Sequence, residues 1–185
     1  MNIAWILLYT LVTHGLEIVI FFKVDGIGIT FERIFKAFLF KILLAFVFLM
    51  IEYMVGDNYL FYFMEPLYGI GLAFLLLRGL PKKLLLFYGL FPMILVNLFY
   101  RGVFYFVLPF WGQEIVDKVS NPIFLLMTIF VCFIVLVFLK WLDYDFTNLR
   151  REILDKTFQK SLTKINWIMG VYYLVMQSLS FFEYE

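Results

Sequence analysis

The sequence is poor in the residues that build disulfides, metal sites and charged surfaces. One cysteine, Cys132, and one histidine occur among 185 residues, so the chain can form no intrachain disulfide and offers no Cys/His spacing for zinc. Charged residues make up only 16%, whereas 64% of residues are hydrophobic and the mean hydropathy is +0.95. This composition excludes a soluble globular domain and indicates an integral membrane protein.

A glycine-rich phosphate-binding loop is absent as well. Gly26, Gly28, Gly69, Gly71 and Gly79 are interpreted as turn or close-packing residues rather than as a phosphate cradle. No basic segment precedes the first hydrophobic run and no small-residue cleavage site follows it, so we do not interpret that run as a cleavable signal. We expect no cofactor, no metal ion and no nucleic-acid partner.

The hydrophobic residues form six stretches, each near the length of about 20 residues that a helix needs to cross a bilayer. Aromatic residues make up 22% of the chain, which predicts rings packed between helices as well as at the interfaces. The predicted fold is all-α, a single transmembrane domain over residues 1–185 built as a bundle of about six helices. The crossings are expected at 3–22, 34–55, 59–77, 84–110, 122–142 and 165–182.

Lys and Arg concentrate in alternate loops, and this distribution predicts an orientation because basic loops stay in the cytoplasm. The first, third and fifth loops are basic, whereas the second and fourth together contain one basic residue, Lys118. With helix ends included, the cytoplasmic side holds 13 Lys and Arg against six acidic residues, and the outer side holds two against seven. We therefore expect a multi-pass protein of the cell membrane with both termini extracellular.

The fifth loop is the longest connection, and its pattern predicts structure. Charged residues separate apolar ones at i, i+3, i+4 spacing, which favours an amphipathic cytoplasmic connector at about 143–163 lying on the inner leaflet. A solvated connector is the alternative. The apolar positions are Phe146, Leu149, Ile153, Leu154 and then Thr157 or Phe158.

Ionisable residues inside the apolar runs are candidate functional residues, because a charge at the bilayer centre costs about 2.5–3.5 kcal/mol on insertion scales. Thr10, Thr13, His14 and Glu17 share one face of the first helix. In the antiparallel second helix, Lys41 lies at a depth that matches Glu17 within about one turn. We hypothesise a Glu17–Lys41 ion pair with His14 beside it. The pair either holds two helices together or takes part in switching.

The outer face combines acidic and aromatic residues. Acids attract a cationic peptide and rings accept its apolar side chains, so this face is a candidate ligand-binding surface. The alternative is that this face is acidic only because basic residues concentrate on the cytoplasmic side, which leaves any outer side acidic. The candidate ligand-binding residues are Glu52, Asp57, Tyr59, Tyr62, Trp111, Glu114 and Asp117.

Four segments carry a resemblance to a known family: IAWILLYTLVTHGLEIVIFFKVDGIGITFERIFKAF, YFMEPLYGIGLAFLLLRGLPKKLL, FPMILVNLFYRGV and FTNLRREILDKTFQK. With them, essentially all 185 residues resemble the N-terminal membrane sensor of peptide-pheromone histidine kinases from Gram-positive bacteria, nearest to the bacteriocin-locus branch of the competence and accessory-regulator receptors. The resemblance implies a sensor for quorum sensing in a two-component system, with a secreted peptide pheromone as its ligand.

Such receptors are expected to continue with a further crossing, a dimerising helix with the phosphoacceptor histidine and an ATP-binding domain, none of which is in this sequence. We therefore expect a sensor without its kinase, either a truncated piece or a naturally short chain. A short chain could sequester the pheromone, form a homodimer or pair with a full-length kinase. The lipid bilayer is its other partner.

Two other functions remain open from the sequence. Six helices in this length is also the size of the substrate-binding subunit of energy-coupling-factor vitamin transporters, although the small-residue AxxxA pattern of their first helix is missing. A membrane peptidase would use a cysteine and a histidine, but Cys132 lies among Phe and Val where its thiol is hard to ionise. No catalytic residue is assigned.

Overall fold

The computed structural model describes residues 3–55, 64–111, 122–143 and 145–182. Over these residues the chain is all-helical, with seven α-helices and one 3₁₀ turn and without a strand. The elements are α1 (Ile3–Asp25), α2 (Phe31–Val55), α3 (Met64–Leu76), α4 (Lys82–Trp111), α6 (Pro122–Leu142), η2 (Phe146–Asn148), α7 (Leu149–Glu152) and α8 (Lys156–Phe182).

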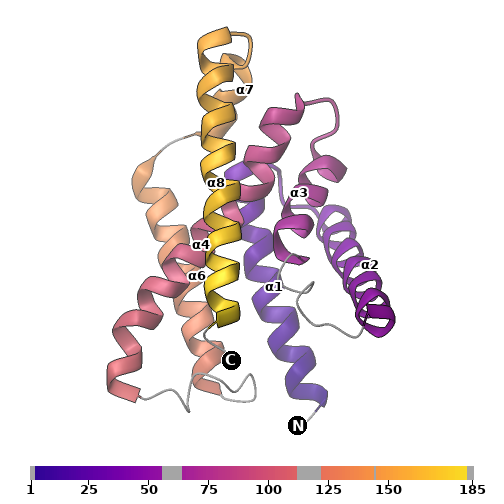
Figure 1. The fold of residues 1–185 in the computed structure, drawn as a ribbon, viewed down its shortest axis with the longest axis vertical. Helices are drawn as coiled ribbons and strands as arrows, with labels where there is room; N and C mark the ends of the chain where they lie inside the picture. The colour runs from indigo at the N-terminus through magenta and orange to yellow at the C-terminus, as the bar shows by residue number, and fades with distance from the viewer. Residues whose placement is uncertain (1–2, 56–63, 112–121, 144, 183–185) are drawn as a thin grey trace.

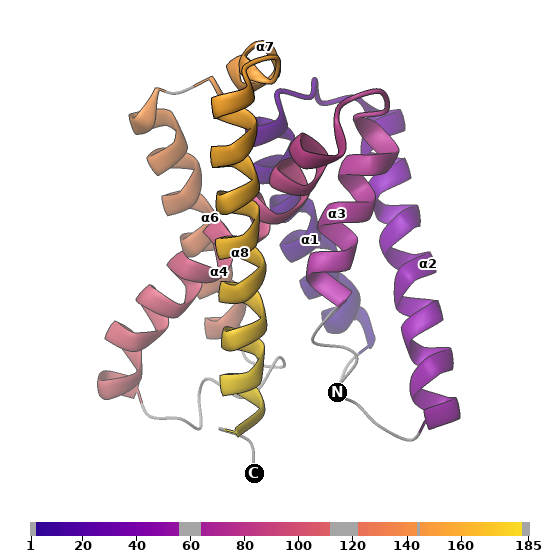
Figure 2. The ribbon, with the colours of Figure 1, turned by 45° about the horizontal axis from the view of Figure 1, so that its top comes forward.

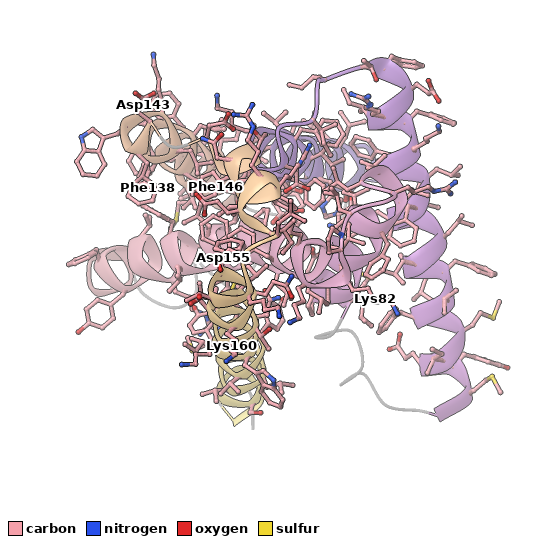
Figure 3. All side chains as sticks on the ribbon, turned by 90° about the horizontal axis from the view of Figure 1, so that it is seen from above. Lys82, Phe138, Asp143, Phe146, Asp155 and Lys160 are labelled. Atoms are coloured by element: carbon pink, nitrogen blue, oxygen red, sulfur yellow. The ribbon has the colours of Figure 1, made fainter. Side chains whose placement is uncertain are left out.

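Three helices are long and apolar enough to cross a membrane: Phe31–Met54, Lys82–Val103 and Leu125–Leu142. Their burial differs: 17% of the most apolar segment of α2 is buried inside the protein, against 56% of the corresponding segment of α4. The large apolar side chains of α2 fan outward from the edge of the bundle (Figure 3). An apolar face left without protein contact on such a helix is suited to lipid.

The helices are arranged around α4, which contacts α1, α3, α6 and α8. Helix α2 packs against α3 and α1, so α2 and α6 lie at opposite edges of the bundle (Figure 2). The core is rich in rings, including the fully buried Phe21, Tyr68 and Tyr88. Aromatic packing between helices, expected from the composition, is therefore present.

Two glycines allow α3 and α4 to approach closely. A Cβ atom on Gly69 would lie 2.2 Å from the carbonyl oxygen of Gly89, and a Cβ atom on Gly89 would lie 2.5 Å from Cα of Ile70. Small residues permit such close backbone contact between membrane helices. Gly26 and Gly79 serve a different purpose, since their φ angles of 61° and 93° are in the left-handed region that favours glycine in turns.

The ends of the elements fall on two sides of the molecule. The start of α1 and the end of α8 lie at one end of the bundle (Figure 1). The connections from α1 to α2 and from α3 to α4 lie at the other end, together with α7 (Figure 2). These connections and α7 belong to the first, third and fifth loops, which are basic and which the charge distribution assigns to one side.

The connector at 143–163 differs from the expected amphipathic helix. Its described residues form η2, α7 and the first two turns of α8, and α8 then continues to Phe182 without a break at the expected boundary of 165. Leu149 is buried, and Phe146, Ile153 and Phe158 pack against the core. These four side chains therefore cover the end of the bundle, whereas Leu154 is 88% exposed. Phe146 lies toward the middle of that end (Figure 3).

Local side-chain hydrogen bonds explain why the connector is broken into short elements. The Asp145 carboxylate accepts hydrogen bonds from the Thr147 backbone N–H at 2.9 Å and from its hydroxyl at 2.6 Å, which starts η2. These two bonds, the larger contribution coming from the hydroxyl, lower the pKa of Asp145. Asp155 accepts from the Thr157 backbone N–H at 2.9 Å and starts α8 in the same way.

Candidate functional site

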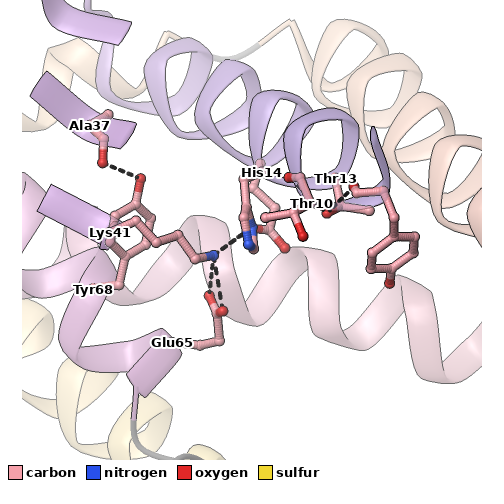
Figure 4. A network of polar contacts seen from close by, with 9 residues as sticks. Thr10, Thr13, His14, Ala37, Lys41, Glu65 and Tyr68 are labelled. Atoms are coloured by element: carbon pink, nitrogen blue, oxygen red, sulfur yellow. Dashed lines mark hydrogen bonds and ion pairs between the residues drawn. The ribbon is translucent and has the colours of Figure 1, made fainter. Parts of the chain in front are cut away.

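A network of charged side chains links the first three helices at the level of Lys41 (Figure 4). Lys41 Nζ lies 3.1 Å from Glu17 Oε2 and 3.0 Å from Glu65 Oε1. The same Nζ lies 2.6 Å from Nδ1 of His14, and that ring nitrogen is also 3.0 Å from Glu17 Oε2. The structure thus places Glu17, Lys41 and His14 in contact, as the depth comparison from sequence predicted.

Glu65 is the member of the network that sequence reasoning missed. Glu65 is one of the seven acidic residues that the charge count places on the outer side, and the structure places it in the first turn of α3. Tyr68, one turn further on, lies beneath the same ammonium, with Nζ 4.8 Å from its ring centroid. The spacing of Glu65 and Tyr68 at i, i+3 was the available signal, because it places both on one face of a helix.

Neighbouring groups hold the network in place. The Tyr68 hydroxyl donates to the carbonyl oxygen of Ala37 at 3.3 Å, and its ring stacks on Phe40 with centroids 5.9 Å apart. These contacts join α3 to α2 on either side of Lys41. Thr13, expected on the polar face of α1, lines the same cavity as His14 and Glu17 and donates its hydroxyl to the Tyr9 carbonyl oxygen at 2.8 Å.

The charges of the network do not balance. Two carboxylates, Glu17 and Glu65, share one ammonium, Lys41, whose side chain is 6% exposed. A single His14 nitrogen faces both Lys41 and Glu17, and it cannot accept from one and donate to the other at the same time. With both carboxyl groups ionised, two negative charges face the single positive charge of Lys41.

A cavity of about 290 Å³ lies directly beside these carboxylates. Five helices line it, α1, α3, α4, α6 and α8, and nine of its eleven lining residues have polar side chains. Lys41 is not among them, so the cavity and the ammonium contact the carboxylates from different sides. The lining residues are Tyr9, Thr13, His14, Glu17, Glu65, Met93, Val96, Asn97, Tyr100, Thr128 and Tyr173.

Most of the ligand-binding surface expected from sequence lies outside the described residues. Asp57, Tyr59, Tyr62, Glu114 and Asp117 belong to that group. Trp111 is the last residue of α4, and its side chain is likewise not described. Glu52 is half-buried on α2 and does not line the cavity.

A second polar cluster lies at the opposite end of the bundle, where the connector docks. Arg150 donates to the backbone carbonyl oxygen of Asp25, and its guanidinium carbon lies 5.4 Å from the centroid of Tyr88. The Tyr88 hydroxyl donates to the carbonyl oxygen of Phe146 at 2.7 Å. Burial of Asp25 raises the pKa of its carboxyl well above the usual range, and the positive charge of Arg150 offsets part of that rise.

The described residues do not assemble a metal or peptidase site. No group of three or more His, Cys, Asp and Glu side chains suited to a metal ion occurs among them. Cys132 is completely buried in α6, whereas His14 bonds with Glu17 and Lys41. Cys132 is thus a free, buried thiol, and His14 is held by two charged side chains.

Together, the apolar helices and the enclosed charges define an all-helical membrane protein with a polar cavity in its interior. No protein-family model, no curated protein and no solved structure gives a significant match to the chain.

Proposed function

We propose that the chain is a multi-pass membrane receptor domain that binds a secreted cationic peptide on the extracellular side. Each of the six crossings expected from sequence overlaps one of the six long helices, α1, α2, α3, α4, α6 and α8. The arrangement of basic connections at one end and of the first and last helix ends at the other supports six crossings with both termini outside.

The observation that carries this proposal is the cavity, whose wall combines two carboxyl groups with tyrosine rings. Tyr9 and Thr13 belong to the first half of α1, and Tyr173 to the second half of α8, so the cavity lies in the part of the bundle nearer the proposed outer side. Carboxylates next to tyrosine rings suit a ligand that is both cationic and apolar. A peptide approaching from outside could place one side chain there while the rest contacts the outer surface.

The sensor role follows from the resemblance to pheromone receptors. In that role, peptide binding would change helix packing and pass the signal to a kinase domain that this sequence does not contain. The chain would then work as the sensor part of a longer kinase, in a homodimer, or paired with a full-length kinase. Cys132 and His14 have no catalytic role in this proposal.

Capture of the natural ligand tests the proposal. The protein is reconstituted in lipid nanodiscs, incubated with conditioned medium of the source organism, and its bound peptides are identified by mass spectrometry. We expect saturable capture of one secreted peptide, competed by its synthetic copy. Empty nanodiscs serve as the control, and capture of no peptide above that control contradicts the receptor function.

The enclosed cavity also supports a second candidate, the substrate-binding subunit of a small-molecule transporter of the vitamin type. A volume of about 290 Å³ is near the lower end of the range of small-molecule sites, about 300–1,000 Å³. Native mass spectrometry of the purified protein distinguishes the two functions. A co-purified vitamin-sized molecule favours the transporter, and a captured peptide favours the receptor.

A further inference from the structure

The charge imbalance beside the cavity indicates what the cavity binds. Glu17 and Glu65 both contact the ammonium of Lys41, so two carboxyl groups share one cation. An uncompensated charge inside a membrane protein is costly and is normally paired. A cationic ligand group in the cavity would neutralise the set.

The geometry allows such a group to reach the carboxylates without displacing Lys41. The ammonium comes from α2, which does not contribute to the cavity wall, whereas Glu17 and Glu65 line the cavity from α1 and α3. The side chain of Glu65 is 35% exposed and that of Glu17 is 20% exposed, so both retain surface beyond their contact with Lys41. A carboxylate has lone pairs for several donors.

The rest of the wall suits a planar cation. Tyr9, Tyr100 and Tyr173 contribute aromatic rings from three helices, and Asn97 contributes a side-chain amide. A guanidinium group stacks on aromatic rings and donates two parallel hydrogen bonds to a carboxylate, which a compact ammonium cannot do. Most of the surface that the wall exposes is apolar, which suits the flat faces of a guanidinium whose edge meets the carboxylates.

We propose that this cavity binds one guanidinium group, with Glu65 and Glu17 as its anionic partners and the tyrosine rings as its stacking surfaces. This inference deepens the proposed function. It rests on that function only for the origin of the guanidinium group, which would belong to an arginine side chain of the peptide. The cavity accounts for one side chain, and the remainder of the ligand binds elsewhere.

Small probes test the cavity separately from the peptide. The probes are N-acetyl-arginine methylamide, its uncharged isostere N-acetyl-citrulline methylamide, and N-acetyl-lysine methylamide. Binding to the nanodisc-embedded protein is measured by isothermal titration calorimetry. We expect saturable binding of the arginine probe and at least about tenfold weaker binding of the other two, as expected for the loss of a charge-assisted hydrogen bond.

Matched variants test whether the arginine probe binds in the cavity. Glu65→Gln should weaken the arginine probe about tenfold or more, because it removes one anionic partner but leaves the Lys41–Glu17 contact that supports folding. Glu32→Gln is the control, since Glu32 is exposed on α2 and bonds to Lys36. If Glu65→Gln does not fold, Val96→Phe takes its place by filling the cavity without altering a charge.

Each outcome bears on a different claim. Equal binding of the arginine and citrulline probes, or full affinity in both Glu65→Gln and Val96→Phe, overturns the cavity assignment. Binding of the lysine probe as tight as that of the arginine probe overturns the choice of guanidinium. If the arginine probe binds but no secreted peptide is captured, the cavity assignment stands and the receptor function fails. If a peptide is captured and Glu65→Gln does not weaken its binding, the receptor function stands and the cavity assignment fails.

Discussion

Gly69 and Gly89 face each other where α3 crosses α4, so closely that a methyl group on Gly69 would lie 2.2 Å from the carbonyl oxygen of Gly89. Backbone atoms, unlike the end of a flexible side chain, cannot move aside alone. This contact fixes the position of α3 and therefore of Glu65, which lies one turn before Gly69.

The glycine contact predicts a strong effect of a single methyl group. Gly69→Ala should destabilise the protein by about 1–3 kcal/mol through overpacking. Gly170→Ala is the control, because nothing lies within 4 Å of its Cβ position and alanine is the better helix former. Thermal unfolding in detergent measures both. Equal stability of the two variants would show that α3 and α4 do not approach this closely.

The ion pair between α1 and α2 predicts energetic coupling. Lys41→Met leaves Glu17 and Glu65 without their shared cation and should cost about 3–5 kcal/mol, whereas Glu17→Gln should cost less because Lys41 keeps Glu65. A double-mutant cycle should give a coupling of about 0.5–3 kcal/mol. Strictly additive effects in Glu17→Gln, Lys41→Met and the double variant would exclude the interaction.

Asp25 predicts a characteristic pH dependence. Burial raises the pKa of the Asp25 carboxyl in the folded state. In the unfolded state an Asp carboxyl has its ordinary pKa of about 3.9, so above about pH 4 the folded state keeps a proton that the unfolded state has lost. The folded state thus binds more protons in this window, and the stability of the wild type relative to Asp25→Asn should fall as the pH rises from about 4 through the raised pKa.

Chemical denaturation of both proteins between pH 4 and neutral pH measures the difference. The loss should approach about 1.4 kcal/mol per pH unit within the window, and Asp25→Asn should lack it. Asp145→Asn is the control, since Asp145 is exposed and its pKa is lowered rather than raised. Parallel pH profiles for wild type and Asp25→Asn contradict the assignment.

The proposed topology predicts which cysteines react from outside the cell. The single native thiol is buried, so Cys132→Ala provides a cysteine-free background. In that background, Ser178→Cys near the end of α8 should react with a membrane-impermeant maleimide on intact cells. Thr30→Cys between α1 and α2, and Asp155→Cys before α8, should react only after permeabilisation. The opposite pattern would invert the orientation.

Hydrophobic run length predicted most of the fold, because bilayer thickness and helix rise leave few alternatives. Each expected crossing overlaps a helix, and residues 59–63 of the third crossing lie outside the described residues. Helix α8 begins at Lys156 rather than 165, and this difference has a local cause. Lys156, Lys160 and Lys164 marked this segment as a loop, but polar residues can occupy a helix that extends beyond the membrane.

The candidate site was predictable in part. Glu17 and Lys41 could be matched because both lie within long apolar runs, where depth can be counted from the helix ends. Glu65 was not matched to Lys41, although it lies six residues into its expected crossing at 59–77, because it was counted with the acids of the outer side. The packing of α3 on α2 and α4 brings it to Lys41. The cavity depends on five helices at once, and no pattern within one segment reveals such a space.

The uninterrupted course of α8 has a mechanical consequence. Its 27 residues span about 40 Å, more than the hydrocarbon thickness of about 30 Å. Tyr173 borders the cavity near one end, and Phe158 packs against the core near the other. A continuous helix behaves as a stiff rod, so a tilt imposed at Tyr173 reaches Phe158 as a displacement instead of being absorbed between them. Helix α8 is thus a lever that joins the cavity to the opposite end of the bundle.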